Sequence, residues 1–146
     1  MMHKQGFQLQ QVLNYRKEVE KARKLEFVTA KREFENASEL LQRHEAEADR
    51  ARVEFNNRQA TGISVNELQM YSNFFSKKTC DIQQQRCQVS SLGQELTEKR
   101  EVLLDAAKEK KSLELLKEKQ LMALRRELAE KERNFLDELS VQRAVR

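Results

Sequence analysis

The sequence has no proline and no tryptophan, only three glycines, and 6% aromatic residues. The missing proline and the scarce glycine are the residues that most often interrupt helices. Few aromatic residues and 36% charged residues leave little material for the core of a compact globular domain. Abundant Glu, Lys, Gln, Leu, Ala and Arg favour helix almost everywhere. We therefore expect an all-α protein.

Long apolar runs are also missing. No window approaches the roughly 20 apolar residues that a membrane-spanning helix needs, and the segment MMHKQGFQLQ lacks the apolar stretch of a signal peptide. We therefore expect a cytoplasmic protein.

Residues that could support chemistry are few. Cys80 and Cys87 lie seven residues apart, which on a helix is roughly 10 Å and too far for a disulfide. The histidines, His3 and His44, are not in helical reach of that pair, so we expect reduced thiols and no metal site. The chain has no glycine-rich phosphate loop and no nucleophile with a recognisable base. These absences predict no cofactor, no small-molecule substrate and no enzymatic activity.

The net charge of +4 comes from acids and bases that alternate along the whole chain. The segment LRRELAEKER is the nearest candidate for binding nucleic acid, but its glutamates weaken it, and we expect no nucleic-acid partner. Steeply salt-dependent binding to DNA would support the alternative. Four pairs have the one-turn spacing that supports exposed helices: Glu20 and Lys24, Glu54 and Arg58, Glu95 and Lys99, Glu127 and Lys131.

The first half of the chain has the seam of a coiled coil, with mostly apolar residues at alternating steps of three and four. The seam consists of Phe27, Ala30, Phe34, Ala37, Leu41, His44, Ala48, Ala51 and Phe55. We interpret His44 as a packed, hydrogen-bonded histidine. The apolar residues that precede the seam do not continue its register smoothly, which predicts a phase shift near Glu20.

The second half has a longer stripe, interrupted by the polar residues Lys78, Gln85 and Lys99. Its members are Leu68, Tyr71, Phe75, Ile82, Val89, Leu92, Leu96, Leu103 and Ala106. A second stripe has drifted from the first and consists of Leu113, Leu116, Leu124, Leu128, Phe135 and Leu139. One long helix with a shifting seam explains both.

The segment TGISVNE predicts the turn between these helices. Gly62 can close the first helix in the left-handed conformation, and Ser64 can cap the second. Glu67 completes a capping box with Ser64, and Ile63 and Leu68 can form a hydrophobic staple around it. So short a link makes the two helices antiparallel neighbours.

The expected architecture is a single coiled-coil domain over residues 1–146, with helix one at about 5–60, the turn at 61–64 and helix two at about 65–142. The helices would be about 80 Å and about 115 Å long. Pairing from the turn places Phe7 opposite about Lys117, so the end of helix two has no partner. Its apolar residues predict a binding surface or an oligomer seam: Leu121, Leu124, Leu128, Phe135, Leu136 and Leu139.

Near the turn, Met70 and Phe74 share a face that is off the main stripe. They form either a docking patch or two ordinary exposed apolar residues.

Three segments, in this order, resemble the flagellar type III export protein FliJ family. FQLQQVLNYRKEVEKARKLEF is similar to the family's opening helix, GISVNELQMYSNFF to its hairpin turn, and EKKSLELLKEKQ followed by EKERNFLDELS to its distal helix. The resemblance implies an antiparallel two-helix coiled coil similar to the central stalk of rotary ATPases.

The resemblance also implies partners. The helix ends would contact the export ATPase hexamer, and the turn region would contact export chaperones and the cytosolic domain of the membrane export gate. The place of action implied is the cytoplasmic face of the inner membrane at the flagellar base. The implied ATPase contacts are Phe7, Leu9, Leu121, Leu124, Leu128, Phe135 and Leu139. The implied turn contacts are Leu41, His44, Ala48, Met70, Tyr71, Phe74 and Lys78, of which His44, Ala48 and Lys78 depart from the family's aromatic or aliphatic pattern.

Two alternatives fit the same residues. One is the equivalent stalk of a virulence type III secretion system, which shares the architecture. The other is a generic coiled-coil scaffold or tether that self-associates through the distal stripe, which concentration-dependent mass in sedimentation would favour.

Overall fold

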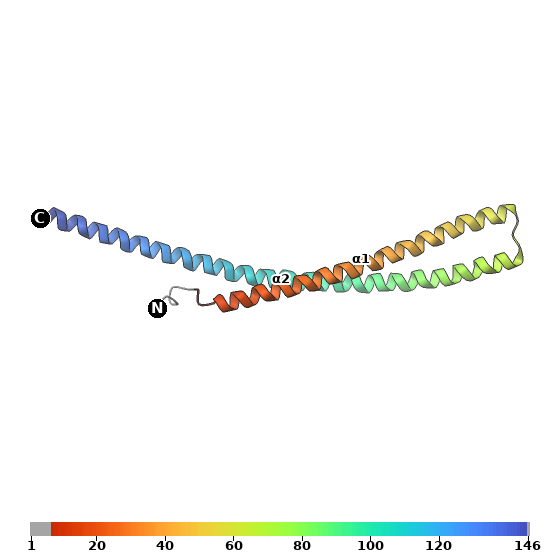
Figure 1. The fold of residues 1–146 in the computed structure, drawn as a ribbon, viewed down its shortest axis with the longest axis horizontal. Helices are drawn as coiled ribbons and strands as arrows, with labels where there is room; N and C mark the ends of the chain where they lie inside the picture. The colour runs from red at the N-terminus through yellow and green to blue at the C-terminus, as the bar shows by residue number, and fades with distance from the viewer. Residues whose placement is uncertain (1–6, 146) are drawn as a thin grey trace. The chain divides into compact units, whose positions relative to one another are not determined.

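The computed structural model describes residues 7–145 and contains two α-helices. Helix α1 spans Gln10–Thr61 and helix α2 spans Val65–Val145, and a three-residue link joins them (Figure 1). The two helices pack against each other as a helical hairpin, which confirms the predicted all-α fold. Residues 5 and 6, where helix one was expected to begin, lie outside the described residues. Residues 7–9 precede the helix, which begins at Gln10.

Contacts divide the chain into two compact units. The hairpin unit is Arg23–Leu103, and the terminal unit combines Met1–Ala22 with Leu104–Arg146, of which 7–22 and 104–145 are described. The expectation of one domain over residues 1–146 stays a prediction.

The predicted seam of α1 faces α2. All nine of its members are buried or half-buried, and the alanines Ala30, Ala37 and Ala48 are 5%, 8% and 3% exposed. On α2 the predicted stripe is likewise buried or half-buried, with one exception. Leu68 is 44% exposed, and the preceding Glu67 is half-buried instead. The alternating spacing therefore identifies the packed faces of both helices.

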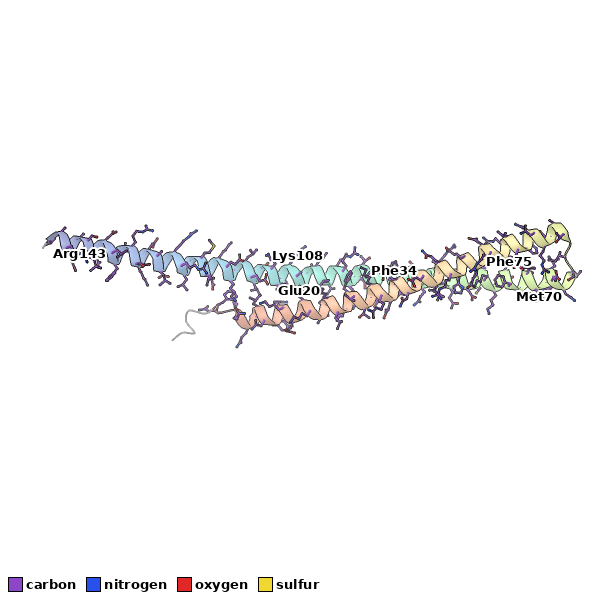
Figure 2. The ribbon with its side chains drawn as sticks, turned by 45° about the horizontal axis from the view of Figure 1, so that its top comes forward. Glu20, Phe34, Met70, Phe75, Lys108 and Arg143 are labelled. Carbon is purple, nitrogen blue, oxygen red and sulfur yellow. The ribbon has the colours of Figure 1, made fainter. Side chains whose placement is uncertain are left out.

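In the hairpin unit a small residue of α2, Gly93, meets a large residue of α1, Phe34. Gly93 lies so close to Phe34 that a Cβ added to it would be 3.3 Å from Phe34 Cε2. Figure 2 shows Phe34 and Phe75 on the two helices of the hairpin unit. Alternating small and large side chains allow close packing without voids.

The expected phase shift near Glu20 is wrong. Leu13 is 1% exposed, and the half-buried Arg16, Glu20 and Arg23 continue the spacing of three and four up to Phe27. Polar residues occupy these seam positions, so the register is not visible when apolar residues alone are followed.

The pairing register agrees with the prediction. In the terminal unit Arg16 forms an ion pair with Glu109. The predicted register places Arg16 opposite Lys108, so the observed partner is one residue from the expected one. In the hairpin unit Lys78 pairs with Glu47 in the same register.

Three of the four predicted charge pairs within one helix do not form. In each of them one member binds a residue of the opposite helix instead. Of the four, the pair Glu127–Lys131 forms, at 3.7 Å. The other pairs lose a member to a partner on the opposite helix: Lys110–Glu20 at 2.8 Å, Arg58–Glu67 at 3.0 Å and Lys99–Glu26 at 3.7 Å. A residue on the facing helix competes with the residue one turn away, and the sequence spacing shows only the latter.

The tight seam predicts a specific sensitivity to volume. Ala48→Leu should lower the free energy of unfolding by about 1–3 kcal/mol, because a buried alanine position cannot accept a larger side chain without displacement. The matched variant Ala46→Leu, on the exposed face of the same helix, should change it by less than about 0.5 kcal/mol. Urea unfolding followed by circular dichroism measures both. Equal losses in the two variants would contradict this packing.

Candidate interaction surfaces at the turn and on the distal helix

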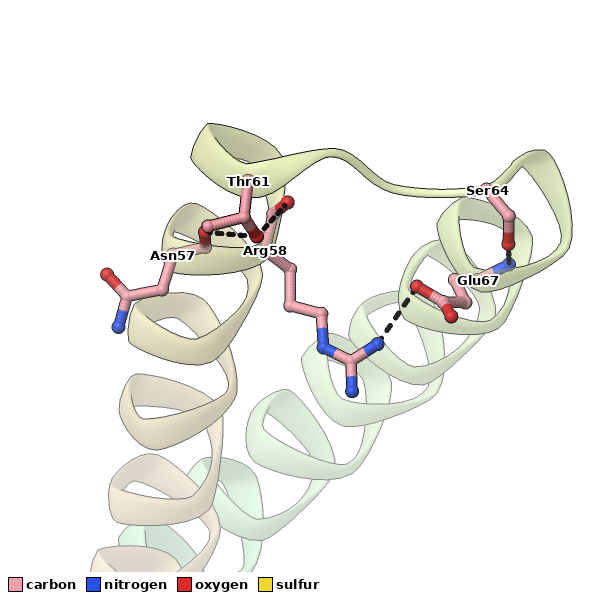
Figure 3. Close-up of polar contacts among 5 residues, drawn as sticks. All are labelled: Asn57, Arg58, Thr61, Ser64 and Glu67. Carbon is pink, nitrogen blue, oxygen red and sulfur yellow. Dashed lines mark hydrogen bonds and ion pairs between the residues drawn. The ribbon is translucent and has the colours of Figure 1, made fainter.

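The turn has the local geometry that its sequence requires. Gly62 adopts φ 104°, a region in which glycine has no steric penalty. Ser64 Oγ accepts a hydrogen bond from the backbone N–H of Glu67 at 3.2 Å (Figure 3). Ser64 O accepts the first bond of α2 from Leu68 N at 3.0 Å. Ser64 is therefore the N-cap of α2.

The side chain of Glu67 joins the two helices. Its carboxylate accepts a hydrogen bond from Arg58 Nη1 at 3.0 Å (Figure 3). A capping box would instead have this carboxylate bind the backbone N–H of Ser64, and no such bond occurs among the described residues. Within α1, Thr61 Oγ1 donates to the carbonyl oxygens of Asn57 and Arg58, both at 3.3 Å. The last turn of α1 and the first turn of α2 are thus fixed by side chains.

Next to the turn lies an aromatic cluster contributed by both helices. Phe55 of α1 lies 5.1 Å from Tyr71 and 5.8 Å from Phe75 of α2, measured between ring centroids. Phe74 meets Phe75 edge to face at 5.7 Å. Contacts of this kind each contribute about 0.5–1.5 kcal/mol beyond the area they bury. The cluster therefore joins the two helices next to the turn.

One face of this cluster opens into a groove, which we call the turn groove. Its volume is about 360 Å³, and it is lined by Ala51, Glu54, Arg58, Glu67, Met70, Tyr71 and Phe74. Met70 is 71% exposed and Phe74 is 40% exposed. Apolar surface flanked by charged side chains is a usual feature of interaction sites.

Tyr71 at the edge of this groove has a raised pKa. Burial raises the pKa of its hydroxyl above the ordinary value of 10.0, and the neighbouring Glu54 carboxylate raises it further. A tyrosine hydroxyl is protonated at physiological pH even without such a shift, so Tyr71 can donate a hydrogen bond.

Lys78 is a charged residue inside the seam and is only 8% exposed. Its ammonium group forms an ion pair with Glu47, donates a hydrogen bond to His44 Nδ1 at 3.0 Å, and lies 5.8 Å from the ring centroid of Phe74. Because an ammonium can only donate, His44 Nδ1 must be the acceptor. A buried charge destabilises a fold unless it is paired, and these three neighbours provide the pairing.

The structure separates the turn residues implied by the family resemblance into two groups. Leu41, His44, Ala48 and Lys78 are buried or half-buried in the seam, while Met70 and Phe74 are exposed and Tyr71 is half-buried at the groove. Lys78 connects the groups through its contact with Phe74. Their role in binding stays a prediction.

The second surface is the end of α2, residues 118–145, which we call the distal helix. Every described residue of it is exposed except Leu124, which is half-buried. Its large apolar side chains are therefore accessible: Leu121 46%, Met122 54%, Leu128 57%, Phe135 59%, Leu136 55% and Leu139 38% exposed. Of the two residues implied near the start of the chain, Phe7 is half-buried and Leu9 is 39% exposed. Four of the six members of the drifted stripe are thus exposed, whereas Leu113 and Leu124 are half-buried.

Sequence reasoning missed two residues that shape these surfaces. Glu47 neutralises Lys78, and Arg58 binds Glu67 beside the turn groove. The signal for Glu47 was the lysine at a seam position, since a buried ammonium requires a carboxylate on the facing helix. Arg58 had already been assigned to Glu54 one turn away.

The described residues contain no cluster suited to a metal ion and no candidate membrane span. Within residues 7–145, no group of three or more His, Cys, Asp and Glu side chains could hold a metal ion. No helix in that range is long and apolar enough to cross a membrane. Cys80 and Cys87 are both free and exposed.

These features define a class of protein: an antiparallel helical hairpin that presents apolar surfaces at its turn and along one helix end. The chain belongs to the flagellar FliJ protein family, whose model matches residues 4–146. No curated protein sequence and no solved structure matches the chain. Family membership implies a component of flagellar protein export, associated with the export apparatus. The family is non-catalytic, which confirms that the protein is not an enzyme.

The seam charge predicts a pH dependence. Lys78, through its hydrogen bond first and its charge second, holds the pKa of Glu47 below the ordinary value of 4.5. A lowered folded-state pKa contributes stability above pH 4.5 that is lost as the pH falls through the folded-state value. Glu47→Gln should therefore be less stable than the wild type at neutral pH, with a difference that disappears in acid.

Urea midpoints between about pH 7 and pH 3 measure this difference. Glu39→Gln, which removes an exposed carboxylate from the same helix, should follow the wild-type profile. A constant difference between Glu47→Gln and the wild type across the pH range would rule out the linkage.

Proposed function

We propose that this protein is the coiled-coil stalk of the flagellar export ATPase. In this proposal the distal helix contacts the ATPase hexamer and promotes assembly and activity of the ring. The turn contacts the cytosolic domain of the membrane export gate and the export chaperones. The protein would then act at the cytoplasmic face of the inner membrane, at the base of the flagellum.

The observation that carries the ATPase contact is the exposed apolar surface of the distal helix. The pair Arg16–Glu109 places the start of α1, Gln10, opposite about Leu115. Farther along, the distal helix keeps Leu128, Phe135 and six other large apolar residues in solvent. Exposed apolar patches on this scale usually mark a binding surface.

The mechanism would be allosteric. A hairpin is not symmetric, so inside a ring it meets different subunits with different side chains. Unequal contacts favour different conformations of chemically identical subunits, which couples nucleotide turnover to the position of the hairpin. Because α2 is one continuous helix from Val65 to Val145, the same element carries residues of both proposed contacts.

Titration of ATP hydrolysis tests the distal contact. The wild type should stimulate the export ATPase of the same bacterium, and a variant with Leu124, Leu128 and Phe135 changed to Asp should not, because three charges prevent apolar packing. A control with Leu25, Val28 and Val53 changed to Asp carries the same charges at exposed positions of α1 and should still stimulate. Circular dichroism checks that both variants are folded.

Lack of stimulation by the wild type, under conditions in which the ATPase forms its ring, would contradict the stalk function. Concentration-dependent mass in sedimentation would then favour a self-associating tether, which uses the same exposed residues.

The turn contact has a separate test. Met70→Ala together with Phe74→Ala should weaken binding to the cytosolic domain of the export gate by about tenfold or more, since exposed aromatic residues in grooves often dominate binding. The control, Val53→Ala with Val65→Ala, removes apolar side chains that are 61% and 82% exposed and do not line the turn groove. Isothermal titration calorimetry measures both affinities. If the two variants bind the export gate with equal affinity, the turn groove does not take part in this contact.

A further inference from the structure

Exposed apolar residues of the distal helix form two neighbouring columns. Leu121, Leu128 and Phe135 make one column at intervals of seven residues, and Met122 and Leu136 belong to the other. All five side chains are between 46% and 59% exposed. Residues seven apart are about two helical turns apart, so each column runs nearly straight along the helix. We call the surface formed by the two columns the distal band.

Two opposite charges lie inside the distal band. Arg125 and Glu132 fall between its two columns and are seven residues, or roughly 10 Å, apart. A partner on the same helix would have to be three or four residues away, but every such position is apolar. These positions hold Leu121, Met122, Leu128, Ala129, Phe135 and Leu136. Neither charge forms an ion pair with any residue of 7–145.

A different face of the distal helix balances its own charges. Arg126, Glu130, Arg133 and Asp137 follow one another at steps of four, three and four residues, so each base has an acid one turn away. Opposite charges with this spacing support a helix face that stays in water. Arg125 and Glu132 lack such neighbours, so their counter-charges must come from another molecule when the band is covered.

A partner that covers the distal band must therefore supply two counter-charges. A charge that is buried without a partner strongly destabilises a contact, and paired charges within an apolar contact select one alignment. The partner needs a carboxylate opposite Arg125 and a base opposite Glu132, about seven helical residues apart, within an otherwise apolar surface. The distal helix itself has this pattern when it is read in the opposite direction.

We propose that two copies of this chain pair in antiparallel orientation through the distal band. A twofold axis next to Leu128 places Arg125 of each copy opposite Glu132 of the other, because residue i meets residue j and residue j meets residue i. The same axis brings Leu121 of one copy close to Phe135 of the other, and the two Leu128 side chains meet beside it. Two ion pairs and a continuous apolar column thus form in one register.

A parallel pair lacks this complementarity. In a parallel pair with twofold symmetry each residue meets its own counterpart. Arg125 would then face Arg125 of the second copy, and Glu132 would face Glu132. Like charges brought together in this way oppose association, so the two charges select the antiparallel orientation.

The pairing concerns the free protein and goes beyond the proposed function. Leu128 and Phe135 belong both to the pair and to the proposed ATPase contact, so a second copy and the ATPase compete for one surface. Pairing keeps these apolar side chains out of water until the ATPase displaces the second copy.

Sedimentation equilibrium of the protein alone tests the pairing. The wild type should show a monomer–dimer equilibrium. Arg125→Glu and Glu132→Arg should each raise the dissociation constant of the dimer about tenfold or more, because each change brings like charges together. An equimolar mixture of the two variants should recover the wild-type constant, since every acid then meets a base. The controls, Arg126→Glu and Glu130→Arg, make the same changes of charge on the other face and should dimerise as the wild type does.

The orientation has its own measurement. A spin label at Ser140→Cys, in a protein with Cys80→Ser and Cys87→Ser, reports the distance between the two copies by double electron–electron resonance. Antiparallel pairing next to Leu128 separates the two labelled positions by 23 residues, or about 35 Å along the helix. Parallel pairing would bring them within roughly 10 Å of each other.

Three results would each overturn the inference: a wild type that is monomeric at all concentrations, a mixture of the two charge variants that does not recover dimerisation, and a short distance between the labels. None of these measurements contains the ATPase, so each would leave the proposed function standing. Conversely, a wild type that dimerises as described but does not stimulate the ATPase would contradict the proposed function and leave the pairing intact.

Discussion

The alternation of three- and four-residue steps along both helices is the constraint on which the other features depend. Two α-helices that pack side by side meet along a narrow line, and only residues with this spacing stay on it. Once Phe34 and Gly93 are opposite each other, the pairing of every other position in the hairpin unit is fixed. The aromatic cluster, the turn groove and the ion pairs across the hairpin are all consequences of this one register.

Polar residues in the seam make the register more specific. Lys78 is accommodated because Glu47, His44 and Phe74 are all within reach of its ammonium group. Gln85 similarly donates to the carbonyl oxygen of Ala37 at 3.0 Å. Shifting one helix along the other would leave these groups buried without partners, at a cost of several kcal/mol for a charge. Such residues stabilise one pairing by destabilising the others, which is the best-attested use of polar seam positions in coiled coils.

The sequence predicts the elements well and their lateral contacts poorly. Periodicity and the segment TGISVNE are local signals, so the helices, the turn and Ser64 as N-cap could be inferred directly. Leu68 was expected in the packed stripe but is exposed, because the half-buried Glu67 occupies the seam position in the first turn of α2. Arg58 and Lys99 each had a suitable acid one turn away, and each pairs with the opposite helix instead. Which of the two acids each base binds depends on the register of the two helices, and no short segment of the sequence determines that register. The surfaces at the turn and on the distal helix could be located from unpaired apolar residues, but their exposure could only be seen in the fold.

The exposure of the distal helix also has a consequence for its dynamics. A helical segment that packs against nothing relies on its own backbone hydrogen bonds and on helix propensity, and such segments open locally far more often than packed ones. A partner that needs the helical form must therefore supply the free energy of ordering as part of its binding. Strong helix formers such as Ala123, Ala129 and Glu130 reduce this cost, whereas Asn134 and Ser140 raise it. The affinity of the protein for its partner is thus set in part by residues that need never touch that partner.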